Sequence, residues 1–483
     1  MKGFIIRYCS LFFVTFFLTS CLGDKAPEEQ ESAQTKDQTL QTDSSIWNEA
    51  TPRSVGFDEQ SLSKAFDYAL ADGTYTQAAL VVKDNKLVYE KYRGMLASEI
   101  TNSSGLVSAI NSLLGISLIA NYPDKDTHVT SWSMAKSVTS VLISIAIEQK
   151  FIKSINDPVS DYLDEWKDEA DSKDEADAKD KVSSSPRTRS KITIRNLLNM
   201  RSGLKVVCLK DQALTYCDHS ESEALAGDNA LVFADNQGDK CLKRPLVSTE
   251  EGELATTKFV YSNCDSLLLS MILEQATGKD LLRFAETELF SKIGIKRINW
   301  WRDSSKIPVG GRNLGYCCFD ATPRDFAKFG QLIVNNGVWD GEQVVPKWYI
   351  DEIKKSAKLV DDVGSYKTSY GLQFWSTFNK ADVNSVVFYA SGLHGQIIIM
   401  DFKNKMVVVR NSLYQPALDQ SDQRVMNISA ESGISFSADL PLDIGKINID
   451  KIKGSSLPIT LPLSVKSNFD FREFYKQVKQ SIK

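Results

Sequence analysis

The chain has 483 residues, 42% of them hydrophobic and 25% charged, so it is long and apolar enough to bury a large core. Its formal net charge of −5 leaves no excess of basic residues, which argues against a nucleic-acid partner. It has only three histidines and no His or Cys cluster at zinc-site spacing, so we expect neither a metal nor another cofactor. These limits favour chemistry on a small molecule.

The N-terminus has the pattern of an export signal. Lys2 and Arg7 precede an apolar run over residues 11–18, which is too short to span a bilayer but suits a signal peptide. The run ends in Leu-Thr-Ser-Cys at 18–21, which resembles the lipobox of bacterial lipoproteins and implies acylation of Cys21. We therefore expect a signal peptide over residues 1–20. The alternative is a plain secretory signal that happens to contain a cysteine.

A lipid on Cys21 would make the membrane a partner of this protein. Each buried CH₂ contributes about 0.8 kcal/mol, so two or more acyl chains hold a protein stably at a membrane. Leu22, rather than an acidic residue, follows the cysteine, which resembles an outer-membrane sorting signal. We expect an exported protein on the periplasmic face of the outer membrane, joined to its anchor by a flexible polar tether over residues 21–50.

The folded domain is expected over residues 51–483 and begins with a helix and a β-hairpin. Apolar residues at helical spacing over 58–71 predict the helix, and residues 79–82 and 87–92 predict the two strands. Ser61 and Lys64 lie in this helix and form a Ser-x-x-Lys match. Because no strand precedes them, we interpret them as part of a solvated helix face.

Ser133 and Lys136 are the first residues that indicate catalysis. They open an apolar helical stretch, and a spacing of three on a helix places the hydroxyl and the amine on one face. A serine hydroxyl is a poor nucleophile until a base removes its proton, and a desolvated lysine can be that base. At a helix N-terminus, backbone N–H groups also stabilise an oxyanion. Ser-x-x-Lys alone is a weak signal, because a chain of this length contains about two by chance.

The middle of the chain is expected to form a mostly helical subdomain over about 136–375. A low-complexity run of Asp, Glu, Lys, Ala and Ser over about 167–190 is interpreted as a solvated acidic insertion. Of the eight cysteines, six remain after Cys9 and Cys21 are set aside, which favours disulfides in an oxidising compartment but leaves their pairing open. These six are Cys208, Cys217, Cys241, Cys264, Cys317 and Cys318.

Tyr261 and Asn263 form a second candidate element, before another apolar helical run. A tyrosine beside a cationic lysine can relay protons, and an asparagine amide can donate to and accept from a substrate amide or ester. Taken alone, the tripeptide Tyr-Ser-Asn at 261–263 is more typical of a helix cap with a packed tyrosine than of a catalytic element.

The last part of the chain contains a third candidate element between predicted strands. Residues 322–325 (Thr-Pro-Arg-Asp) predict a helix start, residues 386–390, 397–400 and 406–409 predict strands, and an apolar stripe over 471–482 predicts a final helix that packs on a sheet. Between the first two strands, Gly392 lets a substrate lie close to the backbone, and the N–H of Leu393 is a candidate oxyanion donor. His394 follows in the same turn and is a further candidate for substrate binding, with an ordinary turn residue as the alternative.

The order of the three elements resembles the serine β-lactamase and penicillin-binding family: a strand pair, Ser-x-x-Lys opening a helix, Tyr-x-Asn opening a later helix, and a glycine at a strand end. More specifically, it is similar to class C β-lactamases and their esterase and 6-aminohexanoate-dimer hydrolase relatives. The resemblance implies a β-lactamase/transpeptidase-like α/β (α+β) fold, with an antiparallel sheet flanked by helices and a mostly helical subdomain. It also implies an acyl-enzyme on Ser133, with Lys136 and Tyr261 as the acid–base pair.

The third element departs from the family pattern of Lys, Ser or Thr, then Gly, because Ala390 stands at the lysine position. The cation that would hold a β-lactam carboxylate is therefore missing, and we expect a small-molecule ester or amide as substrate. On the esterase pattern, the oxyanion donors are the backbone N–H groups of Ser133 and Leu393. Two alternatives stay open: a β-lactamase or D-Ala-D-Ala carboxypeptidase, and a catalytically silent scaffold or sensor. The sequence leaves the oligomeric state open.

Overall fold

The computed structural model describes residues 47–94, 96, 99, 123–167, 186–210, 213–217, 231, 236–247, 259–303, 311–356, 360–363, 366–377, 386–412, 414–415, 459–460 and 467–483. These residues belong to the unit Asp43–Lys483. The expected signal peptide, Cys21, nearly all of the tether and most of the acidic insertion lie outside the described residues.

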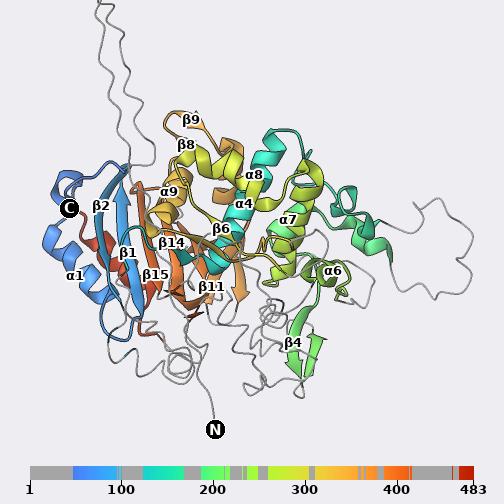
Figure 1. Ribbon diagram of the computed structural model, residues 1–483, viewed down its shortest axis with the longest axis horizontal. Coiled ribbons are helices and arrows are strands. Elements are labelled where there is room, and N and C mark those ends of the chain that lie inside the picture. Colours follow the sequence, from blue (N-terminus) through green and yellow to red (C-terminus); the bar gives the residue numbers. More distant parts are fainter. Residues whose placement is uncertain are drawn as a thin grey trace, which may run out of the picture. The chain divides into compact units, whose positions relative to one another are not determined.

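An eight-stranded antiparallel sheet forms the centre of the fold, with the order β10-β11-β12-β13-β14-β15-β1-β2 (Figure 1). The strands are β1 (Thr76–Lys83), β2 (Lys86–Tyr92), β10 (Val360–Val363), β11 (Tyr366–Gly371), β12 (Phe374–Thr377), β13 (Val387–Gly392), β14 (Gln396–Asp401) and β15 (Met406–Ser412). The first hairpin of the chain joins the last strands, since Val81 of β1 pairs with Val408 of β15. The expected antiparallel sheet, built from both ends of the chain, is confirmed.

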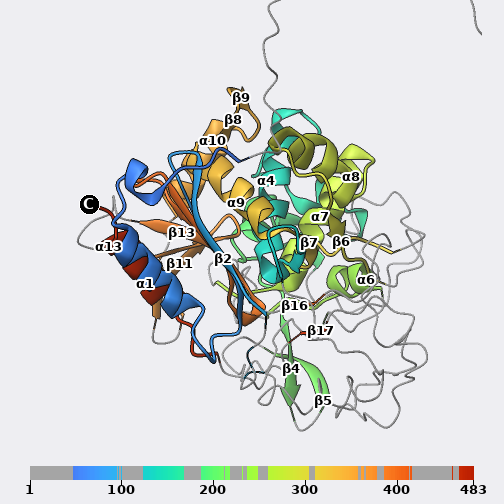
Figure 2. The same ribbon diagram turned by 60° about the vertical axis from the view of Figure 1, so that its left-hand side comes forward.

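Helices α1 (Glu59–Ala69) and α13 (Phe471–Gln480) lie together on one face of this sheet (Figure 2). Asp58 caps α1 by accepting a hydrogen bond from the backbone N–H of Ser61. The stripe predicted near the C-terminus buries Phe474 and Val478 completely in a core shared with α1 and the sheet. The final helix therefore packs as its sequence pattern predicts.

The other face of the sheet is covered by α9 (Pro323–Val334), which packs on β1, β14 and β15. Its start is the predicted one: Thr322 and Asp325 form a reciprocal capping box around Pro at the first helical position. Gly330 lets the helix approach the strands, because a Cβ there would lie 2.6 Å from a methyl carbon of Val407. The sheet thus has a core on both faces, which explains why β1 is buried along nearly its whole length.

Beyond α9 lies a mostly helical part in which α4 (Ala135–Glu148) packs against α7 (Asn263–Thr277). The same part of the chain also contains the helices α5 (Ile194–Leu198), α6 (Gln237–Leu242), α8 (Leu281–Ala285) and α10 (Lys347–Ser356). It contains three small sheets as well: β3 (Val129–Thr130) with β7 (Phe319–Ala321) and β6 (Asn299–Trp300), β4 (Val206–Lys210) with β5 (Ala213–Cys217), and β8 (Val338–Trp339) with β9 (Glu342–Gln343). A last pair is β16 (Tyr414–Gln415) with β17 (Ile459–Thr460). All residues of α4 from Ala135 to Ala146 are buried, as expected for a central helix.

The helical part ends earlier than the sequence suggested. We expected a mostly helical subdomain over about 136–375, but β10, β11 and the first half of β12 fall in this range and belong to the main sheet. Their sequences explain the error: Val-Asp-Asp-Val in β10 and Tyr-Lys-Thr-Ser-Tyr-Gly in β11 have too few apolar residues to show a period of two. β10 is the edge strand of the sheet, and β11 pairs with β10 on one side and with β12 on the other.

Candidate active site

Ser133 lies in a short 3-10 turn, η2 (Trp132–Met134), that runs directly into α4. Two hydrogen bonds fix the turn to β7. The backbone N–H of Ser131 donates to the backbone oxygen of Phe319, and the Ser131 hydroxyl accepts from the backbone N–H of Phe319. Trp132 has a φ of 45°, in the left-handed region that few non-glycine residues adopt. The Ser133 side chain is partly exposed at the N-terminal end of the helix, as expected for a nucleophile.

Lys136 is only 1% exposed, and its amine lies at the centre of the site. Nζ is 3.1 Å from Oγ of Ser133, so the structure brings the predicted pair together. Nζ also donates to the side-chain oxygen of Asn263 at 2.7 Å and to the backbone oxygen of Tyr316 at 2.8 Å. Asn263, the first residue of α7, is 2% exposed, so its hydrogen bond with the Lys136 amine is buried inside the protein.

Tyr261 is placed beside the lysine from the segment that leads into α7. Its ring centroid is 4.8 Å from Nζ of Lys136, within the range of a cation–π contact. The ring also stacks on Trp375 of β12, with centroids 5.6 Å apart and planes inclined by 22°, and it meets Tyr370 edge-on with centroids 6.0 Å apart. Burial raises the pKa of Tyr370 well above its ordinary value, so that hydroxyl stays protonated. Stacking holds the Tyr261 ring against the amine.

The end of β13 touches the serine turn at Gly392. A Cβ at this position would lie 2.4 Å from the backbone oxygen of Ser131 and 3.0 Å from Cβ of Trp132, so only glycine allows this approach. Leu393, the next residue, begins the short turn η12 (Leu393–Gly395). The two predicted oxyanion donors, the N–H groups of Ser133 and Leu393, therefore belong to segments that meet.

His394 lies in the same turn with a φ of 60°, and its ring meets Trp132 edge-on with centroids 6.2 Å apart. Burial, helped by the charge of Arg410, lowers the pKa of His394 to about 4, so the ring is neutral at pH 7. Ala390 is 1% exposed and packs in the main core. Neither residue of this segment supplies the cation that the family pattern places here.

Arg410 was not singled out from the sequence, although it holds this turn in place. It is completely buried in β15 and donates to the backbone oxygens of His394 at 2.8 Å and Gly395 at 3.0 Å. It also donates to the Thr76 hydroxyl at 2.9 Å and to the backbone oxygen of Thr74. Burial lowers its pKa to about 9. Because these oxygens engage its N–H groups, Arg410 anchors the turn rather than offering a charge to a substrate.

Two disulfides border the site, and the sequence left their pairing open. Cys241–Cys264 ties α6 to the first turn of α7, and Cys317–Cys318 joins neighbouring residues directly after Tyr316. Cys208 and Cys217 lie on the paired strands β4 and β5, in register with Thr215 and Val206 respectively.

The Tyr316 carbonyl, which accepts from Lys136, could not be found from the sequence, because a backbone group has no signature in a sequence.

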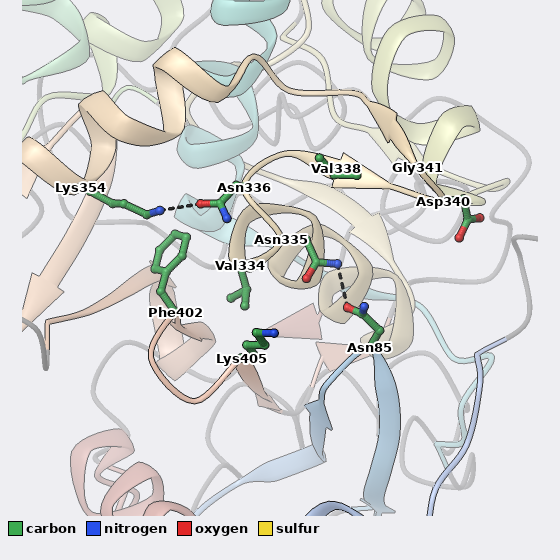
Figure 3. A pocket seen from close by; sticks show the side chains of 10 residues that line it. All are labelled: Asn85, Val334, Asn335, Asn336, Val338, Asp340, Gly341, Lys354, Phe402 and Lys405. Atoms are coloured by element: carbon green, nitrogen blue, oxygen red, sulfur yellow. Dashed lines mark hydrogen bonds between the residues drawn. The ribbon is translucent and has the colours of Figure 1, made fainter.

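Other features of the molecule lie apart from this cluster. Ser61 is exposed on α1, which confirms that the second Ser-x-x-Lys match lies on a solvated helix face. A cavity of about 500 Å³ is lined by Asn335, Lys354, Phe402 and Lys405 among others, and by none of the predicted site residues (Figure 3). Within the described ranges there is no group of His, Cys, Asp and Glu that could hold a metal, and no helix there is long and apolar enough to cross a membrane.

The chain is similar to known proteins in both sequence and structure. The sequence model of the Beta-lactamase family matches residues 63–430. A 6-aminohexanoate-dimer hydrolase from Paenarthrobacter ureafaciens is 26% identical over 182 residues, which are 36% of this chain and 44% of that enzyme, so the match spans less than half of the relative. A solved structure from Bacillus anthracis, described as a 6-aminohexanoate-dimer hydrolase, superposes with a TM-score of 0.52 and 21% identity, covering 76% of this chain and 81% of the other. The chain therefore belongs to the Beta-lactamase family and has its fold.

Proposed function

We propose that this protein cleaves an ester or amide bond through an acyl-enzyme on Ser133, with Lys136 and Tyr261 as the acid–base pair. The proposal depends mainly on the groups that surround the Lys136 amine. A neutral amine has two N–H groups and one lone pair. The oxygens of Asn263 and Tyr316 accept hydrogen bonds from the amine, and Oγ of Ser133 lies 3.1 Å from Nζ, so a neutral amine in this position is within reach of the Ser133 proton. This amine can therefore act as a base.

The reaction starts when Oγ of Ser133 attacks the carbonyl carbon of the substrate and its proton passes to Lys136. The N–H groups of Ser133 and Leu393 stabilise the oxyanion of the tetrahedral intermediate. When the bond to the leaving group breaks, a proton relayed through Tyr261 neutralises that group. A water molecule, deprotonated by the same pair, then attacks the acyl-enzyme and releases the acid, which returns Ser133 to its starting state. Asn263 keeps the amine in position and offers its N–H group to the substrate.

The substrate class follows from the missing cation. A β-lactam carries a carboxylate, and an anion in a partly buried site without a partner costs several kcal/mol. Ala390 stands where the family has its lysine, the pKa of His394 is lowered to about 4, and Arg410 donates to backbone oxygens. Short acyl esters need no cation. The chain is similar to a 6-aminohexanoate-dimer hydrolase, whose name denotes a linear amide substrate. This similarity supports an ester or linear amide rather than a β-lactam as the substrate.

We expect kcat/KM for a short p-nitrophenyl ester to exceed that for a chromogenic cephalosporin by at least roughly a hundredfold, which corresponds to about 2.7 kcal/mol of transition-state discrimination. Initial rates of the purified domain on both substrates, and on a panel of linear amides, test this ranking. Efficient cephalosporin hydrolysis would contradict it and favour the β-lactamase alternative. Folded protein that turns over none of these substrates and takes up no fluorophosphonate would favour a silent scaffold.

We propose further that the protein is exported and lipid-anchored at Cys21. The disulfides Cys241–Cys264 and Cys317–Cys318 support an oxidising compartment. Replacing Cys21 by Ser is expected to move the protein from the membrane fraction to the soluble one, while the purified domain keeps its turnover. Fractionation and incorporation of labelled fatty acid measure this. A wild-type protein without incorporated lipid would refute the anchor and leave a plain exported enzyme.

A further inference from the structure

The segment from Tyr316 to Cys318 contacts both parts of the catalytic turn. The backbone oxygen of Tyr316 accepts from Nζ of Lys136 at 2.8 Å. Two residues later, the backbone N–H of Cys318 donates to the backbone oxygen of Trp132 at 3.2 Å, next to Ser133. The position of this short segment therefore sets where the base lies relative to the nucleophile.

A disulfide between neighbouring residues holds the same segment. Cys317 and Cys318 are bonded to each other and are 2% and 0% exposed. The bond closes a ring that includes the peptide group between the two residues, so the backbone torsions inside the ring are restricted. Cys318 has a φ of 70°, in the left-handed region that a residue with a Cβ rarely adopts without restraint.

The ring is anchored on all sides by its backbone groups. The N–H of Cys317 donates to Leu314 at 3.0 Å, and the oxygen of Cys317 accepts from the Trp300 indole at 3.0 Å. The oxygen of Cys318 accepts from the N–H of Trp301 at 2.9 Å. With both N–H and both C=O groups bonded, the ring cannot turn without breaking several hydrogen bonds. The carbonyl carbon of Tyr316 is bonded to the backbone nitrogen of Cys317, so the fixed ring also fixes the orientation of the Tyr316 carbonyl.

We propose that the Cys317–Cys318 disulfide is a positioning element for Lys136, which holds the Tyr316 carbonyl where it orients the amine toward Ser133. The inference rests on the proposed function, since it concerns how the base Lys136 is oriented toward the nucleophile Ser133. Neither cysteine touches the reacting atoms. Loss of the ring should therefore lower the rate of the chemical step more than substrate binding.

The test removes the ring in two ways in the full-length protein, as Cys317→Ala/Cys318→Gly and as Cys317→Ser/Cys318→Ser. The first pair includes glycine because it accepts the φ of position 318 without strain. Val478→Ala, on α13 across the sheet, serves as a control that removes core packing without contacting the site. Fluorophosphonate labelling to completion counts active sites, so that turnover is expressed per folded molecule.

We expect kcat per site and the rate of fluorophosphonate labelling to fall by about tenfold to a hundredfold in both ring variants, because a small misplacement of a catalytic group has this effect. KM should stay within about threefold of wild type, and Val478→Ala should lower the melting temperature while keeping kcat per site. Unchanged kcat per site in either ring variant would overturn the proposal. Failure of both variants to fold, measured by circular dichroism, would also overturn it, because the ring would then support the whole fold. A wild-type protein that Ser133-directed probes never label would instead refute the proposed function.

Discussion

Replacement of Ser133 by Ala is expected to lower kcat/KM for a short ester by at least about three orders of magnitude, because no solvent molecule can replace a positioned nucleophile. The hydroxyl is partly exposed and near the helix N-terminus, so its removal takes little packing from the core. Folding should therefore be preserved, and the loss should appear in turnover alone. Steady-state kinetics together with thermal unfolding measure the two quantities separately.

Ser61→Ala is the matched control for this variant. Ser61 begins the second Ser-x-x-Lys match, but it is exposed on α1, whereas Ser133 lies 3.1 Å from its lysine. Turnover in Ser61→Ala should equal that of wild type, since an exposed helix residue away from the site has little effect. Equal activity in wild type and Ser133→Ala would refute the nucleophile assignment.

Lys136→Met is expected to lower kcat by about two to four orders of magnitude, the usual contribution of a general base. Methionine fills a similar volume but cannot take the proton of Ser133. It also leaves the oxygens of Asn263 and Tyr316 without their donor, so the melting temperature should fall as well. The rate of fluorophosphonate labelling should decrease in parallel with kcat, because both depend on the activated serine.

Lys64→Met provides the corresponding control, since Lys64 is exposed on α1. It should label and turn over as wild type does. A Lys136→Met protein that is labelled at the wild-type rate would contradict the role of this lysine as base, even if its turnover were low.

Much of the architecture could be predicted from local patterns. The first hairpin, the capping box at Thr322 and the stripe around Phe474 and Val478 each depend on residues close in sequence, and each is confirmed. The order of the motifs predicted which helices carry Ser133 and Asn263, because such order reflects the topology of a family. What failed was the end of the helical part, where β10 and β11 lack an apolar period.

The remaining parts of the site could not be predicted, because tertiary structure creates them. The Tyr316 oxygen is a backbone atom, and only the meeting of distant segments brings it to Lys136. Arg410 looks like the polar end of an apolar strand, yet it is buried and anchors the turn at His394. The bond between Cys317 and Cys318 was one of many open pairings among six cysteines.

We propose that Ser133 is the residue acylated during turnover. Its most direct test is to label the folded wild-type protein with a fluorophosphonate, digest it and locate the adduct by mass spectrometry. We predict one adduct, on the peptide that contains Ser133, with loss of esterase turnover in proportion to labelling. An adduct on another serine, or full turnover after Ser133 is labelled, would contradict the claim.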